Sequence, residues 1–553
     1  MLDAGSKRFQ TLACWFVPLL FGLWSLALGQ DSNWDQSNYH LYNGFAFLNR
    51  KLGIDLAPAG IQSYFNPLLD AVSYLLYTHF PAPFVGFLLG TWHGMTFVVL
   101  LFISRRVVGT VAATQPGKAC FFLALAGCLT ANFLSGLGNT MGDDTTAVIV
   151  LLGVASCLRA LPYQTTPERV KAERSPMLAI LLGGILVGLA SGLKLTNAVY
   201  AVALVAALSI CMGPLWQRIS AIVLGGIGVL IGLGMTGGFW FVRMWETFHN
   251  PVFPMFSHLF PNPLVGSAIV GDAAVWLPKN TLEALLWPFI FALNSYRVGQ
   301  VRIHQIIWPA LYLLFFAWMA VVTVRAARRQ SISKINAQGA FVLMFVAVGY
   351  LVWMKMFSIY RYLVPIEMLA PLAIYILLVD CVKLDLARRS AIIGLSMATL
   401  LVLIGGAKSW GHQKWAKQAF TAEVPHLLHP ASDTVIIIGE SPPYGWLVPF
   451  FPKDLAFSKL DGNFPKTAAY DDALAQMIAR RQGNVYAIVS TDAVRKGQTS
   501  ESIAQINEAA QHHAADVLAA HEMTLVPASC TTYQAKIGQG AVPYQWCKVT
   551  SAK

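Results

Sequence analysis

Long apolar segments alternate with short polar connections along most of the chain. Most of these segments hold roughly the 17–25 mainly apolar residues that a helix needs to cross the hydrocarbon core of a bilayer. They lie near residues 11–29, 83–104, 119–135, 145–160, 176–192, 196–213, 219–238, 306–324, 339–355, 363–380 and 390–406. The pattern predicts an α-helical polytopic membrane protein with about eleven transmembrane helices.

Composition and charge support this class. Hydrophobic residues make up 56% of the 553 residues and charged residues only 12%, against about 25% charged in a typical soluble domain. The formal net charge is +12, but the basic residues cluster in every second connection, as in the cytoplasmic loops of membrane proteins. These clusters are Arg105, Arg106 and Lys118; Arg159, Arg169, Lys171 and Arg174; Arg218; Arg325, Arg328, Arg329 and Lys334; Lys383, Arg388 and Arg389. The excess charge therefore reports orientation, and nucleic acid is not an expected partner.

The same charges set the expected topology. Lys7 and Arg8 precede the first span and place the N-terminus in the cytoplasm; no small-residue cleavage site follows, so this span is expected to be retained. An odd number of spans then leaves residues 407–553 outside. Two further apolar stretches, 67–80 and 285–294, are short, and counting the first as a span would place the later arginines outside. Both are predicted to lie along the outer membrane surface.

Residues 407–553 follow a different pattern, that of a small α/β domain attached to a transmembrane domain of residues 1–406. Strands are expected at 434–439, 484–490, 523–527, 533–537 and 546–549, and helices at 473–481 and 501–520. Cys530 and Cys547 both lie in this tail. Outside the cytoplasm the environment is oxidising, so the two cysteines are expected to form a disulfide.

The connection after the first span, DSNWDQSNYH at residues 31–40, is the densest in chemistry-bearing side chains. Asp35, Asn38 and Tyr42 share one face if this segment is helical. A carboxylate among aromatic and amide side chains suits general-base activation of a hydroxyl group. We therefore expect Asp35 to be catalytic and Asn38, Tyr39 and His40 to bind donor or acceptor. The alternative is an interfacial aromatic belt in which Asp35 caps a helix.

A second acidic motif, NTMGDD at residues 139–144, begins the fourth span from the outside. Asp143 and Asp144 there can simply reflect the preference of carboxylates for helix N-termini. The functional alternative is a second acidic element that positions a substrate or holds a divalent cation such as Mg or Mn through oxygen ligands. The sequence leaves the metal ligands and the need for any cofactor open.

Several positive side chains lie on the predicted outer side, against the orientation bias. A lipid-linked phosphate or pyrophosphate would explain them, because guanidinium and ammonium groups bind phosphate oxygens. Pairing with lipid headgroups, or with Glu246 and Glu367, is the alternative. The residues concerned are Lys194, Arg243, Arg297, Arg302, Lys355 and Arg361. Of these we expect Lys194, Arg243, Arg297 and Arg361 to contact the donor.

In their order along the chain, these motifs resemble the GT-C superfamily, integral-membrane glycosyltransferases that use polyprenyl-phosphate sugar donors. WDQSNYHLYN resembles the first-loop motif whose Asp is the proposed catalytic base, which carries to Asp35. FNPLLDAVSYLLYTHF resembles the juxtamembrane helix that follows, and NTMGDD the second acidic motif, which carries to Asp143 or Asp144. GLASGLKLTN, HNPVFPMF and IYRYLVP resemble later motifs. The first loop departs from the family in having one carboxylate beyond Asp31 instead of an adjacent acidic pair, which leaves metal dependence open.

The resemblance implies an inverting glycosyltransferase, hexosyl or pentosyl, of the bacterial inner membrane, with the C-terminus in the periplasm. It would move a sugar from a polyprenyl-phosphate donor to a glycan, lipid or protein acceptor, in contact with membrane lipids. One alternative is an O-antigen-ligase-like lipid-processing transferase. Another is a lipid or glycan flippase, but transporters carry ionisable residues within their spans, and such residues are scarce here.

Overall fold

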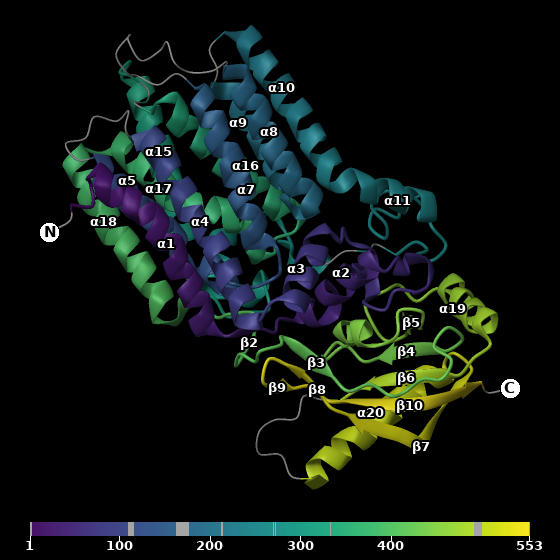
Figure 1. Ribbon diagram of the computed structural model, residues 1–553. Coiled ribbons are helices and arrows are strands. Elements are labelled where there is room, and N and C mark those ends of the chain that lie inside the picture. The colour runs from purple at the N-terminus through teal and green to yellow at the C-terminus, as the bar shows by residue number, and fades with distance from the viewer. Residues whose placement is uncertain are drawn as a thin grey trace.

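The computed structural model describes residues 3–108, 116–161, 176–211, 214–268, 270, 273–331, 333, 335–491 and 500–551. It has a bundle of long helices and, at one end, a domain of strands and two helices (Figure 1). Some of the predicted basic residues, including Arg169, Lys171, Arg174 and Lys334, lie outside the described residues.

Helices follow the predicted apolar segments. Among the described residues, eight are long and apolar enough to cross a membrane, so a polytopic helical membrane protein is confirmed. They are α1 (Lys7–Leu28), α4 (Ala82–Val108), α8 (Pro176–Leu193), α10 to α11 (Leu215–Phe248), α15 (Ile307–Ala327), α16 (Ala337–Met356), η8 with α17 (Tyr360–Cys381) and α18 with η9 (Leu384–Gly406). The predicted spans at 119–135, 145–160 and 196–213 fold as α5 (Pro116–Cys128) with α6 (Ala131–Gly136), α7 (Asp143–Ala160) and α9 (Ala198–Cys211). The full count of eleven crossings stays a prediction.

The two short apolar stretches fold as short helices outside the long spans. They are α3 (Leu68–His79), and α13 (Thr281–Leu285) with α14 (Trp287–Leu293). Helix α3 buries Asp70, Ala71 and Tyr77 and exposes Val72 and Leu75. One buried face and one exposed apolar face are typical of a helix that lies on a membrane surface.

The C-terminal part is an α/β domain, as the sequence predicts. Its main sheet has the order β5-β4-β6-β10-β7. Strands β5, β4 and β6 run parallel to one another, and β10 pairs antiparallel with both of its neighbours, β6 and β7. The strands are β4 (Thr434–Ile438), β5 (Ala456–Lys459), β6 (Val485–Ser490), β7 (Met523–Tyr533) and β10 (Tyr544–Ser551), with helices α19 (Ala468–Arg481) and α20 (Ser500–Ala519). A smaller sheet joins β3 (Phe420–Ala422), β8 (Ala535–Ile537) and β9 (Gly540–Ala541).

The strand predicted at residues 523–527 is longer in the structure, and the strand predicted at 533–537 begins two residues later, at Ala535. The sequence suggested that a strand ends at Pro527, whereas β7 continues through it to Tyr533. Proline lacks a backbone N–H, and at the edge of a sheet that group has no partner to lose. Because β7 is the last strand of its sheet, the proline is tolerated there.

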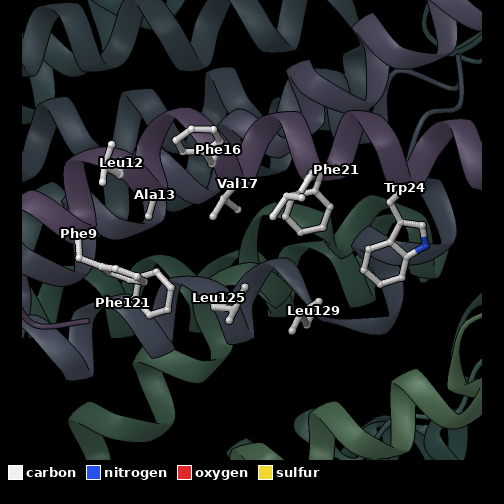
Figure 2. A pocket seen from close by; sticks show the side chains of 11 residues that line it. Phe9, Leu12, Ala13, Phe16, Val17, Phe21, Trp24, Phe121, Leu125 and Leu129 are labelled. Atoms are coloured by element: carbon white, nitrogen blue, oxygen red, sulfur yellow. The ribbon is translucent and has the colours of Figure 1, made fainter. Parts of the chain in front are cut away.

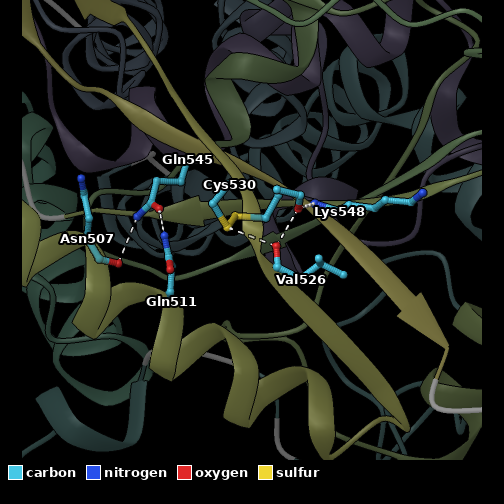
Figure 3. Close-up of a disulfide and its surroundings, with 8 residues drawn as sticks. Asn507, Gln511, Val526, Cys530, Gln545 and Lys548 are labelled. Carbon is cyan, nitrogen blue, oxygen red and sulfur yellow. Dashed lines mark hydrogen bonds between the residues drawn. A yellow bond between two sulfur atoms is a disulfide. The ribbon is translucent and has the colours of Figure 1, made fainter.

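The disulfide between Cys530 and Cys547 is confirmed. Cys530 lies in β7 and Cys547 in the neighbouring β10, where the register shifts between Trp546 and Lys548 (Figure 3). Next to the bridge, the hydroxyl of Ser529 accepts a hydrogen bond from the backbone N–H of Lys548. The disulfide therefore joins two adjacent strands across an irregularity in their pairing.

The strands that follow the first and last long helices pair with each other between the bundle and the C-terminal domain (Figure 1). Strand β1 (Gln30–Asp31), just after α1, pairs antiparallel with β2 (His412–Gln413), just after α18 and η9. The N-terminus lies at the opposite end of the bundle (Figure 1). The start of α1 and the C-terminal domain therefore lie at opposite ends of the bundle, while the number of crossings and the side of the membrane on which each end lies stay predictions.

A buried ion pair in the segment between α1 and α4 attaches that segment to the C-terminal domain. Lys51 Nζ lies 3.0 Å from Asp55 Oδ1, and both side chains are almost completely buried. Lys51 also donates to the carbonyl of Lys453, while Asp55 accepts hydrogen bonds from the backbone of Phe457 and from Tyr42. Burial raises the pKa of Asp55 to about 6 despite the neighbouring ammonium.

The same loop also extends the domain's sheet. The backbone of Leu56 donates to the carbonyl of Phe457, and Leu56 forms a parallel bridge with Ser458 at the edge strand β5. Asn463 accepts from the backbone of Ile61 and donates to Gln62. The loop therefore covers an edge that would otherwise expose unpaired backbone groups, and the two parts of the chain form one interlocked unit.

We expect Cys530→Ser to lower the stability of the C-terminal domain. The bridge spans a sequence separation of 17, and in the chain-entropy model a loop of that length contributes about 3 kcal/mol. Thermal unfolding of the purified protein, with and without reductant, measures the effect. Reductant should lower the transition of the wild type but not that of the variant. Cys381→Ser, at a free cysteine, should leave the transition in place, and an unchanged Cys530→Ser protein would contradict the prediction.

Lys51→Met should weaken the docking of the C-terminal domain in a pH-dependent way. Removing one partner of a buried ion pair costs about 3–5 kcal/mol, because the other charge stays buried and unpaired. Without the ammonium, the pKa of Asp55 rises above its present value of about 6. A carboxyl group whose pKa is raised on folding favours the folded state at low pH and loses that contribution as pH rises through the raised pKa.

The destabilisation by Lys51→Met should therefore be large at about pH 8 and shrink at about pH 5, where Asp55 is neutral. Unfolding of the purified variant at the two pH values measures it. Lys453→Met, at an exposed lysine nearby, is the matched control and should have little effect. A pH-independent loss in Lys51→Met would contradict this account of the pair.

Candidate active site

Four charged side chains from distant parts of the chain meet at the end of the bundle that lies next to the C-terminal domain. Arg361 Nη1 forms an ion pair with Asp35 Oδ2, and its Nε lies 3.9 Å from Asp143 Oδ2. Lys194 Nζ lies 2.6 Å from Asp143 Oδ1 and donates to the carbonyl of Met141. The side chains of Asp35 and Arg361 are only 10% and 16% exposed. We call Asp35, Asp143, Lys194 and Arg361 the charged cluster.

A network around Asp31 holds the loop that carries Asp35. Asp31 Oδ1 accepts from the backbone and side chain of Asn33, and Asp31 Oδ2 accepts from the backbone and hydroxyl of Thr140. The side chain of Asn33 in turn accepts from the backbone of Gln36. Asp31 therefore ties the Asp35 loop to the second acidic loop, and its role is structural.

A glycine turn aims Asp143 into the cluster. Gly142 precedes α7 with φ of 84°, in the left-handed region where a side chain would be strained. Asp143 and Asp144 then occupy the first turn of the helix, where the helix dipole favours negative charge. Asp143 reaches Lys194, whereas Asp144 packs against Gly136 inside the bundle.

Hydrogen bonds to its backbone fix the short helix η8 (Tyr360–Leu363), which carries Arg361. Asn132 donates to the carbonyl of Tyr360, Tyr200 donates to that of Tyr362, and Trp353 donates to that of Ile359. Asn132 itself is held by Glu367, which accepts from its backbone N–H and from the indole of Trp308. Glu367 therefore helps to position this segment, and it forms no ion pair with an arginine among the described residues.

Aromatic rings enclose the two cations of the cluster. The guanidinium carbon of Arg361 lies 5.3 Å from the ring centre of Tyr362 and 5.6 Å from that of Trp410. Lys194 Nζ lies 5.3 Å from the ring of Tyr362. These distances are within the range of cation–π attraction, which stabilises the positive charges where water is scarce.

The environment keeps Asp35 ionised. Its burial alone would raise its pKa, but Arg361, with smaller contributions from His40 and Lys194, holds the pKa below the ordinary value. For Lys194 burial is the strongest influence and lowers the pKa, against the opposing effect of Asp143. A carboxylate with a lowered pKa is a weak base, so Asp35 is not activated in this arrangement.

The other predicted residues of the first loop have separate partners. His40 Nδ1 lies 2.6 Å from Asp70 Oδ1, Asn38 donates to the carbonyl of Ala59, and the ring of Tyr39 lies 4.1 Å from that of His40. Asp35, Asn38 and Tyr42, expected to share one helix face, do not meet in one site, because the hydroxyl of Tyr42 donates a hydrogen bond to Asp55. Residues Gln36–His40 form a π-helical turn, which alters the spacing of an ordinary helix.

Two predicted donor-binding arginines lie outside the cluster. Arg243 is exposed on α11 (Phe239–Phe248) and lies 3.7 Å from Glu246. Arg297 pairs with Glu283 at 2.5 Å and lies 5.1 Å from the ring of Trp287. Their contact with a donor stays a prediction, as do the roles of Asn38, Tyr39, His40 and Asp144.

The residues present do not form a metal site as they stand. The described part of the chain has no group of three or more His, Cys, Asp or Glu side chains that could hold a metal ion. The carboxylates of Asp35 and Asp143 already face Arg361 and Lys194. Protein cations thus occupy the positions that a divalent cation would need, and we derive no step through a metal.

An apolar groove runs along the outside of α1 and α5. It encloses about 570 Å³, and its lining includes Phe9, Phe16, Trp24, Phe121 and Leu129 (Figure 2). The lining has no ionisable group, so the groove can accommodate hydrocarbon but cannot transfer protons. The charged cluster is therefore the candidate for chemistry.

Comparisons with known proteins give structural matches only. No family model and no curated protein matches the chain. ArnT from Cupriavidus metallidurans, solved bound to undecaprenyl phosphate, is 15% identical with a TM-score of 0.42, over 72% of this chain and 73% of that one. The oligosaccharyltransferase of Archaeoglobus fulgidus, tethered to an acceptor peptide, is 13% identical with a TM-score of 0.44, over 88% of this chain and 69% of that one.

A third solved structure is AglB from Archaeoglobus fulgidus in complex with an inhibitory peptide and a dolichol-phosphate. It is 13% identical with a TM-score of 0.40, over 87% of this chain and 70% of that one. All three matches have TM-scores below 0.5 and identities of 15% or less. At such low scores they do not assign an activity, which must be argued from the charged cluster.

Proposed function

We propose that this chain is an inverting glycosyltransferase that moves a sugar from a polyprenyl phosphate to an acceptor hydroxyl at the outer face of a bacterial inner membrane. The observation that carries the proposal is the charged cluster. It combines one ionised carboxylate, Asp35, with two cations suited to phosphate, Arg361 and Lys194. These are the two groups that transfer from a sugar phosphate needs.

The proposed reaction is a single displacement. Asp35 accepts the proton of the acceptor hydroxyl while that oxygen forms a bond to the anomeric carbon. The bond from this carbon to the phosphate oxygen breaks, and its electron pair leaves with the polyprenyl phosphate. The attack comes from the face opposite the leaving group, so the anomeric configuration inverts. Arg361 and Lys194 stabilise the charge that develops on the phosphate.

The protein's own cations support a reaction without a metal. Guanidinium and ammonium groups at a nearly dry site can stabilise phosphate charge as a divalent ion does elsewhere. Asp143, which faces both cations, holds them together in the absence of substrate. In this proposal it is a positioning residue and does not touch the sugar.

A flippase or lipid transporter is less consistent with the described residues. Such a protein needs ionisable groups along a path through its helices. His93, buried within α4, instead accepts a hydrogen bond from the backbone of Gly138, and its other ring nitrogen lies 3.0 Å from the hydroxyl of Thr145. It is a satisfied structural histidine that fixes the second acidic loop.

We expect Asp35→Asn to abolish transfer while the protein remains folded. Loss of a general base lowers rates by about 10²–10⁴-fold. The measurement is transfer by the purified protein, reconstituted in nanodiscs, with undecaprenyl-phosphate-linked sugars and extracted envelope acceptors. Glu246→Gln removes an exposed carboxylate of the outer region and should keep activity. Full activity in Asp35→Asn would rule out the assignment of the base.

Chelation should not affect transfer. Because Arg361 and Lys194 supply the positive charge, EDTA should leave the rate unchanged, and added Mg or Mn should not raise it. The assay is the same transfer reaction after exhaustive dialysis against the chelator. A loss of activity that Mg or Mn restores would show that a metal site forms on substrate binding and would refute the metal-free mechanism.

A further inference from the structure

Arg361 faces two incompatible demands in the proposed reaction. Its guanidinium is the nearest cation to Asp35 and forms an ion pair with it. The same guanidinium is a principal group available to receive the donor phosphate. Asp35 Oδ2 accepts a hydrogen bond from Arg361 Nη1 and is therefore shielded from an acceptor hydroxyl, and the lowered pKa of Asp35 makes the carboxylate a poor base.

The surroundings of Arg361 provide a second position for its charge. Asp143 Oδ2 lies 3.9 Å from the Arg361 Nε and has no hydrogen-bond partner within the described part of the chain. The rings of Tyr362 and Trp410 lie 5.3 and 5.6 Å from the guanidinium carbon, so two aromatic faces also stabilise its charge beside Asp35 and Asp143. The planar fork of donors suits both a carboxylate and a phosphate.

We propose that the Asp35–Arg361 ion pair is a substrate-controlled lock on the catalytic base. When the donor binds, its phosphate draws Arg361 away from Asp35 toward the phosphate and Asp143. This movement exposes the Asp35 carboxylate to the acceptor at the moment when a donor is in place. The lock rests on the proposed function and adds to it an order of events, with the donor bound before the base is active.

The lock has a thermodynamic consequence for donor binding. Breaking the ion pair is part of the cost of binding, so the apparent affinity for a polyprenyl phosphate is lower than the intrinsic one. Removing the Asp35 charge abolishes that cost. Asp35→Asn should therefore bind the lipid phosphate more tightly than the wild type, although it cannot catalyse transfer.

Binding of undecaprenyl phosphate to purified protein in nanodiscs tests this directly. We expect Asp35→Asn to bind about tenfold more tightly than wild type, equivalent to about 1.4 kcal/mol. In an Arg361→Gln background the same change should have an effect of about twofold or less, because no competition for the guanidinium remains. Glu246→Gln should match the wild type.

Three outcomes would overturn the lock. An equal gain in both backgrounds would mean that Asp35 acts only by long-range charge, and no gain would mean that Arg361 does not leave it. In either case undecaprenyl phosphate still binds, so the proposed function stands. The absence of any binding to wild type and variants alike would overturn the lock and the proposed function together.

A second measurement needs no variant at Asp35. The groups facing Asp35 are Arg361, His40, Lys194 and Tyr39. If donor binding removes Arg361 from this set, the pKa of Asp35 rises in the complex. The acid limb of kcat, which reports the complex, should then lie at higher pH than that of kcat/KM, which reports the free enzyme. Coincident limbs would contradict the lock.

Discussion

The ion pair between Asp35 and Arg361 is the constraint around which the charged cluster, at the end of the bundle next to the C-terminal domain, is organised. It joins residues separated by 326 positions in the sequence, and it holds two charges with little access to water. Burying charges is costly unless they are paired and hydrogen-bonded. The second pair, Asp143 with Lys194, and the rings of Tyr362 and Trp410 supply the additional partners that make this arrangement possible.

The C-terminal domain also contacts the segment that carries Asp35. It contacts the segment between α1 and α4 through Lys51 and Asp55 and through the backbone pairing of Leu56 with β5. Its η10 segment (Gly445–Phe450) packs Gly445 against the backbone carbonyl of Asn38, with no room for a side chain. The indole of Trp34, beside Asp35, donates to the carbonyl of Glu440. The domain therefore restricts how the Asp35 loop can move.

Helix positions were readable from the sequence because hydrophobic length is a strong local signal. The predicted spans each contain a described helix, and the strands at Thr434–Ile438 and Val485–Ser490 were found from short buried apolar runs. The alternation of basic loops indicated that the termini lie at opposite ends. The boundary at Pro527 failed because tolerance of proline depends on the strand being at an edge, which is a tertiary property.

Within the site, the sequence singled out Asp35, Asp143, Lys194 and Arg361, which the structure brings together. The sequence could not reveal which of these residues form ion pairs with each other, because the pairs join distant segments. Asp31, Asp70 and Glu367 were missed as positioning groups for the same reason. Arg243 and Arg297 meet the same sequence criterion, a position on the predicted outer side, but in the structure each pairs with a glutamate close by in sequence, Glu246 and Glu283.

The most direct test of the account is a structure of the full chain, in nanodiscs, with undecaprenyl phosphate bound. We predict that the phosphate contacts Arg361 and Lys194, and that Arg361 no longer contacts Asp35, whose carboxylate faces the space beside the phosphate. A phosphate bound away from these residues would contradict the proposed function. A phosphate on Lys194 with the Asp35–Arg361 pair intact would contradict the lock.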